Sequence, residues 1–588
     1  MKSQRSTIQR SSRRRLSVAI VAALAIVAIF SFRLIDIQIV RADALNKDST
    51  SKRAVAVATY APRGDIVDEN GVVLATSVNR YYVTAAPINV KAFDRTGKDG
   101  KDTVVSVMDA ATEIATIVKL DPAAVFLSLT KDPKTNYAVV AKDLDTATMR
   151  EVRDLDIPWI SFETHPKRIY PDGSVAGNLV GYVGTDGPQA GIENMYDKCL
   201  ASTNGTSTYQ QGADGVQIPG SSVTTEAAKN GGTVKLTIDS DLQWFSTQAI
   251  AEQATAIGAQ SATAVVIRVK DNHLMAVADW PAVDPNNVGA TDVHNMGSLA
   301  FTDQYEPGST FKGMSAAMLI ETGTATPLTH ATVPDYWRTP EGGFVADAES
   351  HPIEHLTLTG VLQQSSNIGI SMIGSKLAAS TRYDYMTKFG VGSKTAVDFQ
   401  GEASGSLQKT WDDQTKYNVL YGQGVSATAL QVASIYSTLA NGGEKLPLVL
   451  VEGCTNADGT VTDTPSTAGT RVVSESTAKT VNNMLESVVT GGGLSKAVTI
   501  PGYRVAGKSG TAEVAANGVY TSDRIVSFVG MAPADDPQYV VLVTYTKPAT
   551  MKSSAAAAPT FHKIMAEVLT KYRVPPSTTP STSPATTW

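Results

Sequence analysis

The stretch Tyr305-Glu306-Pro307-Gly308-Ser309-Thr310-Phe311-Lys312 combines a break in the chain with the start of a helix. Pro-Gly interrupts regular structure, and residues 309–321 then have the pattern of a helix that ends before Gly323. Lys312 is one turn after Ser309 and so projects from the same helical face. A serine hydroxyl becomes a useful nucleophile when a neighbouring base takes its proton, and a lysine can be that base if burial and a nearby cation lower its pKa. The stretch therefore predicts a serine nucleophile with a lysine base.

This S-x-x-K spacing is a weak signal by itself, because a pair of this kind is ordinarily a solvated helical face. The same spacing also occurs at Ser49/Lys52, Ser128/Lys131, Ser406/Lys409 and Ser476/Lys479. The prediction therefore depends on companion motifs further along the chain.

Two such motifs are present, in order. Ser365-Ser366-Asn367 closes a short apolar-patterned stretch and gives S-x-N. Lys508-Ser509-Gly510 is the only K-[ST]-G in the chain, and it lies in sequence that can form a strand. S-x-N alone is also common by chance, but S-x-x-K, S-x-N and K-[ST]-G in this order form the motif set of class A β-lactamases and penicillin-binding proteins.

Strand-forming runs stand at both ends of the region that holds the motifs. Residues 263–269 and 273–278 are joined by a short polar turn, which is typical of a hairpin. Residues 525–531 and 539–545 form a second pair, and a helix is expected over 557–572. Helix-rich sequence separates the two pairs, so the pattern predicts an α+β domain whose sheet is assembled from both ends.

The beginning of the chain has the features of a membrane anchor. Residues 1–15 carry six Lys or Arg and no acidic residue, and residues 16–32 carry no charge. A helix needs about 20 mostly apolar residues to cross a bilayer, and residues 16–39 reach that length if Arg33 snorkels and Asp36 lies at the outer interface. Because positive charge stays on the cytoplasmic side, a single-pass protein with a cytoplasmic N-terminus is expected. A cleaved signal peptide is the alternative, but its apolar run is shorter and ends in small residues.

The composition of the whole 588-residue chain limits the class of protein. Hydrophobic residues make up 42% and charged residues 18%, which suits globular domains. The net charge of -6 gives no reason to expect a nucleic-acid partner. Cys199 and Cys454 are far apart and are more often separate buried thiols than a pair, although an extracytoplasmic location would permit a disulfide.

The amino-acid composition changes along the chain after the anchor, and these changes divide it into regions. Residues 40–225 form a mixed region. Residues 201–232, which span its end, are rich in small polar residues and are predicted to be irregular loop or linker. Residues 226–573 hold the three motifs. Residues 574–588 consist largely of Pro, Ser and Thr and are expected to be disordered.

On these features the sequence resembles the penicillin-binding proteins, specifically the monofunctional class B transpeptidases of the cell-division type, from the membrane helix to about residue 570. Five further motifs carry the resemblance: Arg63-Gly64-Asp65-Ile66-Val67-Asp68-Glu69-Asn70-Gly71, Arg168-Ile169-Tyr170-Pro171, Gly181-Tyr182-Val183-Gly184, Gly191-Ile192-Glu193 with Tyr196-Asp197, and Tyr421-Gly422-Gln423-Gly424. The resemblance implies a β-rich pedestal domain of the dimerisation type over 40–225 and a transpeptidase domain over 226–573 with an antiparallel sheet covered by helices. Ser509 stands where many relatives have Thr, and both present a hydroxyl.

The resemblance also implies a role for each motif residue. Ser309 would attack the penultimate carbonyl of a peptidoglycan stem peptide that ends in D-Ala-D-Ala, with Lys312 as base. Ser365 would relay a proton to the leaving amine, and Asn367 would bind the substrate amide. Backbone N–H groups of Ser309 and Thr511 would form the oxyanion hole. The substrate carboxylate would be held by Lys508, Ser509, Gly510 and Thr511.

The same resemblance implies the ligands and partners. β-Lactams would acylate Ser309 as substrate mimics, and no cofactor or metal is implied. No stretch before residue 225 has the length and motifs of a glycosyltransferase domain, so a separate membrane glycosyltransferase and division proteins are the expected partners. A role in septal wall synthesis rests on family likeness.

Three other function classes and one motif that resembles a zinc site are alternatives to this interpretation. A β-lactam sensor would need a cytoplasmic signalling part, for which residues 1–15 are too short. A β-lactamase would need a group that activates the deacylating water, and a division scaffold leaves the motif set unexplained. His351-Pro352-Ile353-Glu354-His355 fits an inverted zinc-protease pattern, but Pro352 would occupy the second helical position. A surface loop before the next helix is therefore expected there.

Overall fold

The computed structural model describes residues 4–97, 100–212, 218–516 and 519–588, and the chain forms two compact units. Unit 1 comprises Met1–Ala61, Asn79–Lys167 and Thr203–Lys229, and unit 2 comprises Pro62–Val78, Arg168–Ser202 and Asn230–Trp588. The sequence predicts a boundary at 225/226 between the two globular domains. The division differs from it because the segments 62–78 and 168–202 pack with the later part of the chain.

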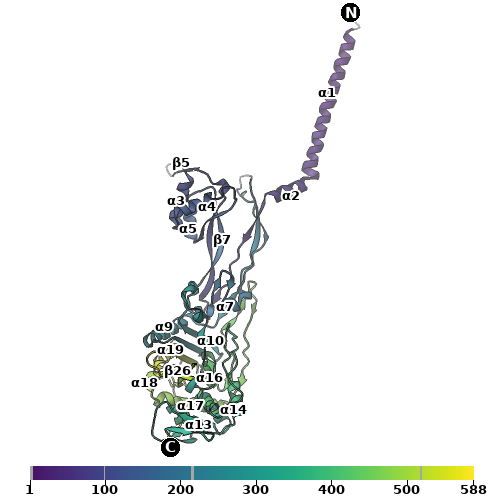
Figure 1. Ribbon diagram of the computed structural model, residues 1–588. Helices are drawn as coiled ribbons and strands as arrows, with labels where there is room; N and C mark the ends of the chain where they lie inside the picture. The colour runs from purple at the N-terminus through teal and green to yellow at the C-terminus, as the bar shows by residue number, and fades with distance from the viewer. Residues whose placement is uncertain (1–3, 98–99, 213–217, 517–518) are drawn as a thin grey trace. The chain divides into compact units, whose positions relative to one another are not determined.

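Unit 1 begins with the predicted apolar helix. Helix α1 (Gln4–Ile35) is long and continuous (Figure 1), and a π-helical segment over Asp36–Val40 and helix α2 (Ala42–Arg53) come after it. In the described part of the chain, the span Arg13–Val40 is the one helical segment long and apolar enough to cross a membrane. Residues 1–3 of the predicted basic tail lie outside the described residues.

The polar segment after residue 200 contains strands, where the sequence predicts irregular structure. Strand β10 (Gly205–Gln210) pairs antiparallel with β1 (Ala54–Thr59) and with β11 (Val223–Glu226). Threonine is polar but β-branched, so a Thr-rich stretch can form a strand without an apolar pattern. The low hydrophobicity of the segment concealed this pairing.

The rest of unit 1 is a small α/β lobe. Its helices are α3 (Val107–Val118), α4 (Pro122–Thr130) and α5 (Thr146–Arg153), and they surround a core that includes Ile114, Leu129 and Val152. Its strands include β4 (Phe93–Thr96), β5 (Asp102–Val105) and β6 (Ala138–Leu144), which pairs with the end of β3 (Val73–Ala85).

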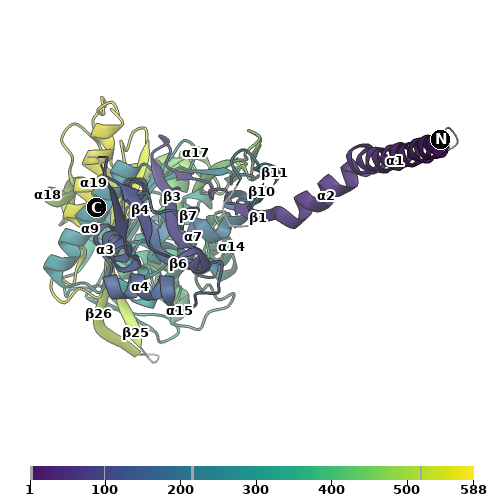
Figure 2. The same cartoon turned by 90° about the horizontal axis from the view of Figure 1, so that it is seen from above.

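The main sheet of unit 2 has five antiparallel strands in the order β14-β13-β27-β26-β25. The strands are β13 (Ser261–Arg268), β14 (His273–Trp280), β25 (Ala506–Ala516), β26 (Val519–Ala532) and β27 (Tyr539–Thr546). Figure 2 shows β25 and β26 side by side at one edge. The sheet is therefore assembled from both ends of the motif region, as the sequence predicts.

Helices cover both faces of this sheet. Val265 and Leu542 belong to one core, and their neighbours Val266 and Val541 belong to another, because successive side chains of a strand point to opposite faces. The second core includes helices α9 (Ser240–Ile257) and α19 (Ala558–Lys571). The first includes α11 (Lys312–Glu321), α12 (Leu358–Gln364), α13 (Asn367–Gly374), α16 (Ala429–Ala440) and α17 (Glu475–Gly491).

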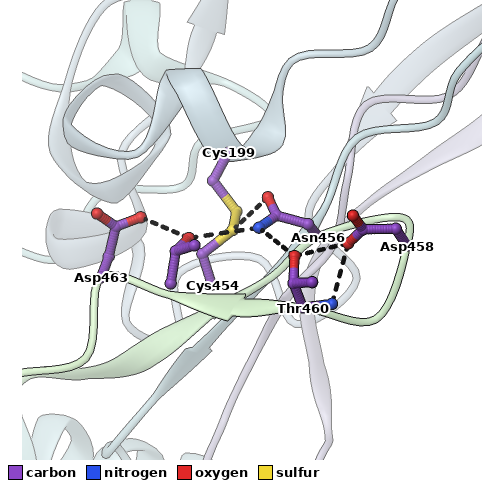
Figure 3. The surroundings of a disulfide bond; sticks show 7 residues. Cys199, Cys454, Asn456, Asp458, Thr460 and Asp463 are labelled. Carbon is purple, nitrogen blue, oxygen red and sulfur yellow. Dashed lines mark hydrogen bonds between the residues drawn. A yellow bond between two sulfur atoms is a disulfide. The ribbon is translucent and has the colours of Figure 1, made fainter.

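The two cysteines form a disulfide (Figure 3), although the sequence favours separate thiols. Cys199 lies on α8 (Asp197–Leu200) and Cys454 on β22 (Val451–Thr455), with a Cα–Cα distance of 6.3 Å. Strand β22 pairs with β12 (Thr233–Leu236), which brings the two segments together. The two cysteines are 255 residues apart in sequence, and they meet because of this strand pairing. No local sequence pattern predicts such a pairing.

Residues 574–588 also differ from the prediction, because they pack along unit 2 and are not disordered. The Ser577 and Thr579 hydroxyls donate to the two carboxylate oxygens of Asp535, at 2.8 and 3.1 Å. Thr587 pairs antiparallel with Leu356. Hydrogen bonds and the ring contacts of Trp588 hold a segment whose composition offers little apolar surface.

Candidate active site

A tight turn presents Ser309 at the start of the helix that carries Lys312. A short 3-10 turn, η5 (Gly308–Phe311), leads directly into α11, as predicted. Gly308 has φ +59°, and a Cβ there would lie 3.1 Å from the Thr511 carbonyl oxygen on β25. Glycine therefore lets the nucleophile turn approach the strand that carries the K-S-G motif.

The Tyr421-Gly422-Gln423-Gly424 block supports this turn from the other side. The Gly308 N–H donates to the Gly422 carbonyl oxygen at 3.0 Å. Gly422 has φ +79°, and a Cβ there would lie 2.3 Å from the Gly308 carbonyl oxygen. The sequence identified this block only by likeness, and its physical role is to hold the turn that presents Ser309.

Lys312 is fully buried and lies at the centre of the site. Its Nζ lies 3.1 Å from Ser309 Oγ, 3.3 Å from Ser365 Oγ and 2.7 Å from Asn367 Oδ1. It also donates to the Ser365 carbonyl oxygen. Burial, together with the charge of Lys508, holds the pKa of Lys312 well below its ordinary value, against a smaller opposing effect of Asp347. A buried lysine with a lowered pKa beside a serine hydroxyl is suited to accept a proton from it.

Ser365 lies between the two lysines. It ends α12 in the left-handed conformation, with φ +60°, and its Oγ lies 2.9 Å from Lys508 Nζ. The next residue, Ser366, caps α13 by accepting from the Gly369 N–H at 2.8 Å. The middle position of S-x-N is therefore structural, and the outer two positions face the reaction centre.

Asn367 begins α13 and has its amide engaged at both ends. Its Oδ1 accepts from Lys312, and its Nδ2 donates to the Ala346 carbonyl oxygen at 3.0 Å. An amide carries two N–H donors and an oxygen with two lone pairs. Contact with a substrate amide, the role that the resemblance implies, is compatible with the partners seen here.

Lys508 extends from β25 and is also fully buried. Its Nζ lies 3.2 Å from Ser509 Oγ as well as within reach of Ser365. Burial lowers the pKa of Lys508 to about 7. The pKa of Lys312 is lowered as well, so each of the two lysines gives up its proton more readily than an exposed lysine does.

The other residues of the K-S-G strand differ in exposure. Ser509 is half-buried and Thr511 is exposed, and residues two apart share a face of a strand. The Thr511 hydroxyl accepts from the Ser554 N–H at 3.2 Å. Gly510 is needed for packing, because a Cβ there would lie 2.4 Å from Ser527 Oγ. The Ser509 hydroxyl lies beside Lys508, and the Thr511 hydroxyl is on the same face of the strand as Ser509, an arrangement that suits a carboxylate.

Asp347 is a site residue that sequence reasoning missed. Its Oδ1 accepts from the backbone N–H groups of Asn367 and Ile368, and its Oδ2 pairs with His351 Nε2 at 3.2 Å. It therefore fixes the start of α13, where Asn367 lies. No motif marks this aspartate, and its distance from α13 in sequence hid the contact.

The two histidines of the zinc-like motif do not share a helical face. His351 lies in a loop and its Nδ1 bonds to the Pro352 carbonyl oxygen at 2.7 Å, whereas His355 lies in strand β19 (Glu354–Thr357). The predicted loop is thus present at His351, but a strand replaces its second half. Among the described residues there is no group of three His, Cys, Asp or Glu side chains that could hold a metal.

The two lysines predict a bell-shaped pH dependence of serine acylation. Acid should protonate Lys312 and remove the base, and a rise in pH through about 7 should remove the charge of Lys508 in the free protein. The second-order rate constant of acylation, measured across pH, reports these free-protein groups. In Lys508→Arg the alkaline limb should disappear, since arginine keeps its proton. An unchanged alkaline limb in that variant would assign it to another group.

A serine with a buried lysine beside it and a second hydroxyl between two lysines form an arrangement suited to serine acyl transfer. The sequence matches two family descriptions: the penicillin binding protein transpeptidase domain over residues 262–566, and the penicillin-binding protein dimerisation domain over residues 58–236. The chain belongs to the penicillin-binding proteins that carry both domains.

Named relatives agree over most of the chain. Penicillin-binding protein PbpB of Mycolicibacterium smegmatis is 34% identical, covering 95% of this chain and 90% of the relative. Peptidoglycan D,D-transpeptidase FtsI of Escherichia coli is 30% identical, covering 92% of this chain and 89% of the relative.

Solved structures of similar proteins match the fold of this chain over most of its length. A peptidoglycan synthetase from Bifidobacterium adolescentis superposes with a TM-score of 0.71 at 32% identity, covering 91% of this chain and all of that chain. Penicillin binding protein 3 from Mycobacterium tuberculosis, complexed with aztreonam, gives 0.67 at 28% identity, covering 90% of this chain and all of that chain.

Proposed function

We propose that this chain is a membrane-anchored peptidoglycan D,D-transpeptidase that cross-links stem peptides through an acyl-enzyme on Ser309. The observation that carries the proposal is the distance of 3.1 Å between Lys312 Nζ and Ser309 Oγ, in a buried site that also holds Ser365 and Lys508. The relative FtsI is named for this activity.

Acylation begins when neutral Lys312 takes the proton of the Ser309 hydroxyl. The Ser309 oxygen forms a bond to the penultimate carbonyl carbon of a D-Ala-D-Ala peptide, and the bond from that carbon to the terminal D-Ala nitrogen breaks. Ser365 contacts both lysines and can pass a proton to the departing nitrogen. The proton taken from Ser309 thus leaves with the amine, and Lys312 is neutral again.

Deacylation uses the same groups in reverse. An amine from a neighbouring stem attacks the ester, its proton passes to Lys312, and the Ser309 oxygen leaves and regains a proton. The backbone N–H groups of Ser309 and Thr511 are proposed as the oxyanion hole, each worth about 3–4 kcal/mol. The close approach of Gly308 to Thr511 supports this, because it brings the turn and the strand together.

Lys508 and the hydroxyls of Ser509 and Thr511 are proposed to bind the terminal carboxylate. A bound carboxylate would favour the charged form of Lys508. β-Lactams carry a carboxylate and a reactive amide, so they should acylate Ser309 in place of the peptide. The structural relative from Mycobacterium tuberculosis was solved with aztreonam and with ampicillin.

A cross-linking assay tests the proposed activity. The purified chain, given a D-Ala-D-Ala stem peptide and an amine acceptor, should release D-Ala and form the cross-linked product in equal amounts, and Ser309→Ala should form neither. Release of D-Ala without cross-linked product, whichever acceptor amine is supplied, would indicate a hydrolase instead.

The proposed topology places residues 1–15 in the cytoplasm and the rest of the body outside, because Arg13, Arg14 and Arg15 stand at the start of the apolar span. A separate membrane glycosyltransferase and division proteins are the proposed partners, reached through the anchor and the region before residue 225. We expect a membrane-impermeant fluorescent penicillin to label the protein in intact spheroplasts, and an N-terminal epitope to be accessible only after lysis. The opposite pattern would reverse the orientation.

A further inference from the structure

The last residues of the chain pair through an isolated bridge with a small two-stranded sheet beside the active-site helices. Strand β16 (His330–Val333) pairs antiparallel with β19, and Thr587 pairs with Leu356 on the free side of β19. The Thr357 N–H donates to the Thr586 carbonyl oxygen at 3.0 Å. We call residues 583–588 the strap.

Trp588 anchors the strap on both strands of this sheet. Its ring stacks on His330, with centroids 4.2 Å apart and planes at 2°, and meets His355 edge-on at 5.0 Å. Strand β16 in turn packs against α13, beside which Figure 1 marks the end of the chain. An aromatic contact of this kind stabilises a segment that has few other apolar groups.

Thr357 connects the strap to the first turn of α12. It is the N-cap of the helix, and its Oγ1 accepts from the Gly360 N–H at 3.1 Å. The same hydroxyl donates to the Ala585 carbonyl oxygen at 2.6 Å. The cap is therefore fixed by the strap on one side and the helix on the other.

Gly360 is the position at which the backbone of the strap lies against α12. A Cβ at Gly360 would lie 1.9 Å from the Thr586 carbonyl oxygen, which is far too short for two atoms that are not bonded. Any larger residue must displace the strap or the helix. A glycine in the first turns of a helix costs stability relative to alanine, so this glycine serves the contact.

The far end of the same helix carries Ser365. Helix α12 has seven residues, so its capped start lies only about 10 Å from its end at a rise of 1.5 Å per residue. Both the strap and the helix bond to α17: the Ser583 hydroxyl donates to the Asn483 carbonyl oxygen at 2.8 Å, and Gln363 Nε2 donates to the Ser487 carbonyl oxygen at 3.1 Å. The strap and α12 thus share one support.

We propose that the strap is a positioning element for the S-x-N motif, holding α12 so that Ser365 lies between Lys312 and Lys508. The inference rests on the proposed role of Ser365 in acyl transfer. The strap touches none of the reacting groups and acts through α12. A displacement of about 1 Å at a reacting group can cost about 10²-fold in rate.

Removal of residues 585–588 from the otherwise full chain should lower the first-order rate constant of β-lactam acylation about 10- to 100-fold. Active-site titration should still reach one β-lactam per chain, because the protein remains folded. A strap that only stabilised the fold would instead reduce the titrated fraction and leave the rate of the remaining molecules unchanged. Thr587→Ala, which keeps the backbone pairing and changes an exposed side chain, is the matched control and should behave as the parent.

Gly360→Ala gives a second test, because its effect on the melting temperature should have opposite signs in the full chain and the shortened chain. In the full chain the added Cβ displaces the strap, so acylation should slow and the melting temperature should fall. In the chain without residues 585–588 the same substitution should leave acylation unaffected and raise the melting temperature, since alanine is the better helix former.

Equal acylation by the parent and the shortened chain, or the same penalty for Gly360→Ala in both, would overturn the proposal. Failure of the parent itself to acylate would instead contradict the proposed function.

Discussion

Replacing Lys312 with arginine is expected to slow acylation of Ser309 by about 10²–10⁴-fold, the usual cost of losing a general base. Arginine keeps the positive charge but cannot give up its proton in a protein. Lys312 is fully buried and its Nζ is 3.1 Å from Ser309 Oγ, so the structure offers it as the base. Stopped-flow measurement of β-lactam acylation would give the rate.

Lys508→Arg is the matched control, because Lys508 is equally buried and the substitution adds the same guanidinium. Lys508 is proposed to supply charge, which arginine also supplies, so the loss of rate should be far smaller than in Lys312→Arg. Both variants should be checked for a cooperative melting transition. Comparable losses, or a mild effect at Lys312, would mean that another group takes the serine proton.

Replacing Glu193 with alanine is expected to cost about 3–5 kcal/mol of unfolding free energy, because it leaves buried charges without their partner. Glu193 is fully buried, and its carboxylate pairs with Arg63 Nε at 2.7 Å and with Arg168 Nε at 2.6 Å. The Tyr170 hydroxyl donates to the same carboxylate at 3.3 Å. Denaturant unfolding of the parent and the variant would measure the difference.

Asp197→Ala provides the comparison. Asp197 also pairs with Arg63, but its side chain is 45% exposed, and exposed ion pairs contribute about 0–1 kcal/mol. A loss of stability at Asp197 as large as that at Glu193 would contradict the argument from burial. The effect at Glu193 should appear as a shift of the denaturation midpoint with little change in slope.

This cluster joins three of the four motifs that carry the family likeness before residue 225. Arg63, Arg168 and Glu193 each belong to a different one of these motifs, which carry the resemblance to a pedestal domain. In the structure their side chains meet, since Glu193 accepts from both arginines. The sequence shows that the motifs exist, but only the fold shows that they form one set of ion pairs.

The main sheet and the reaction centre could be predicted because their signals are local. Strand runs rich in apolar residues stand at both ends of the motif region, and the helix after Ser309 is marked by Pro-Gly before it and Gly323 after it. The order of the three motifs then indicates that Lys312, Ser365 and Lys508 belong to one site. The distances from Ser365 Oγ to the two lysine nitrogens, 3.3 and 2.9 Å, agree with that grouping.

The features that escaped prediction depend on long-range pairing. Cys199 and Cys454 meet because β12 and β22 pair, and residues 583–588 are held mainly through backbone carbonyls and hydroxyls, which composition cannot reveal. Asp347 contacts the start of α13 across a loop. In each case the contacts are specific hydrogen bonds, ring contacts or a disulfide, and not a periodic apolar pattern.

The position of the covalent adduct tests the central claim most directly. After reaction with benzylpenicillin, peptide mapping by mass spectrometry should find one adduct per chain on Ser309, and Ser309→Ala should carry none while remaining folded. Ser365 and Ser509 are the real competitors, since their hydroxyls lie 2.9 and 3.2 Å from Lys508 Nζ. An adduct on either of them, or one that persists in Ser309→Ala, would contradict the assignment of Ser309 as the nucleophile.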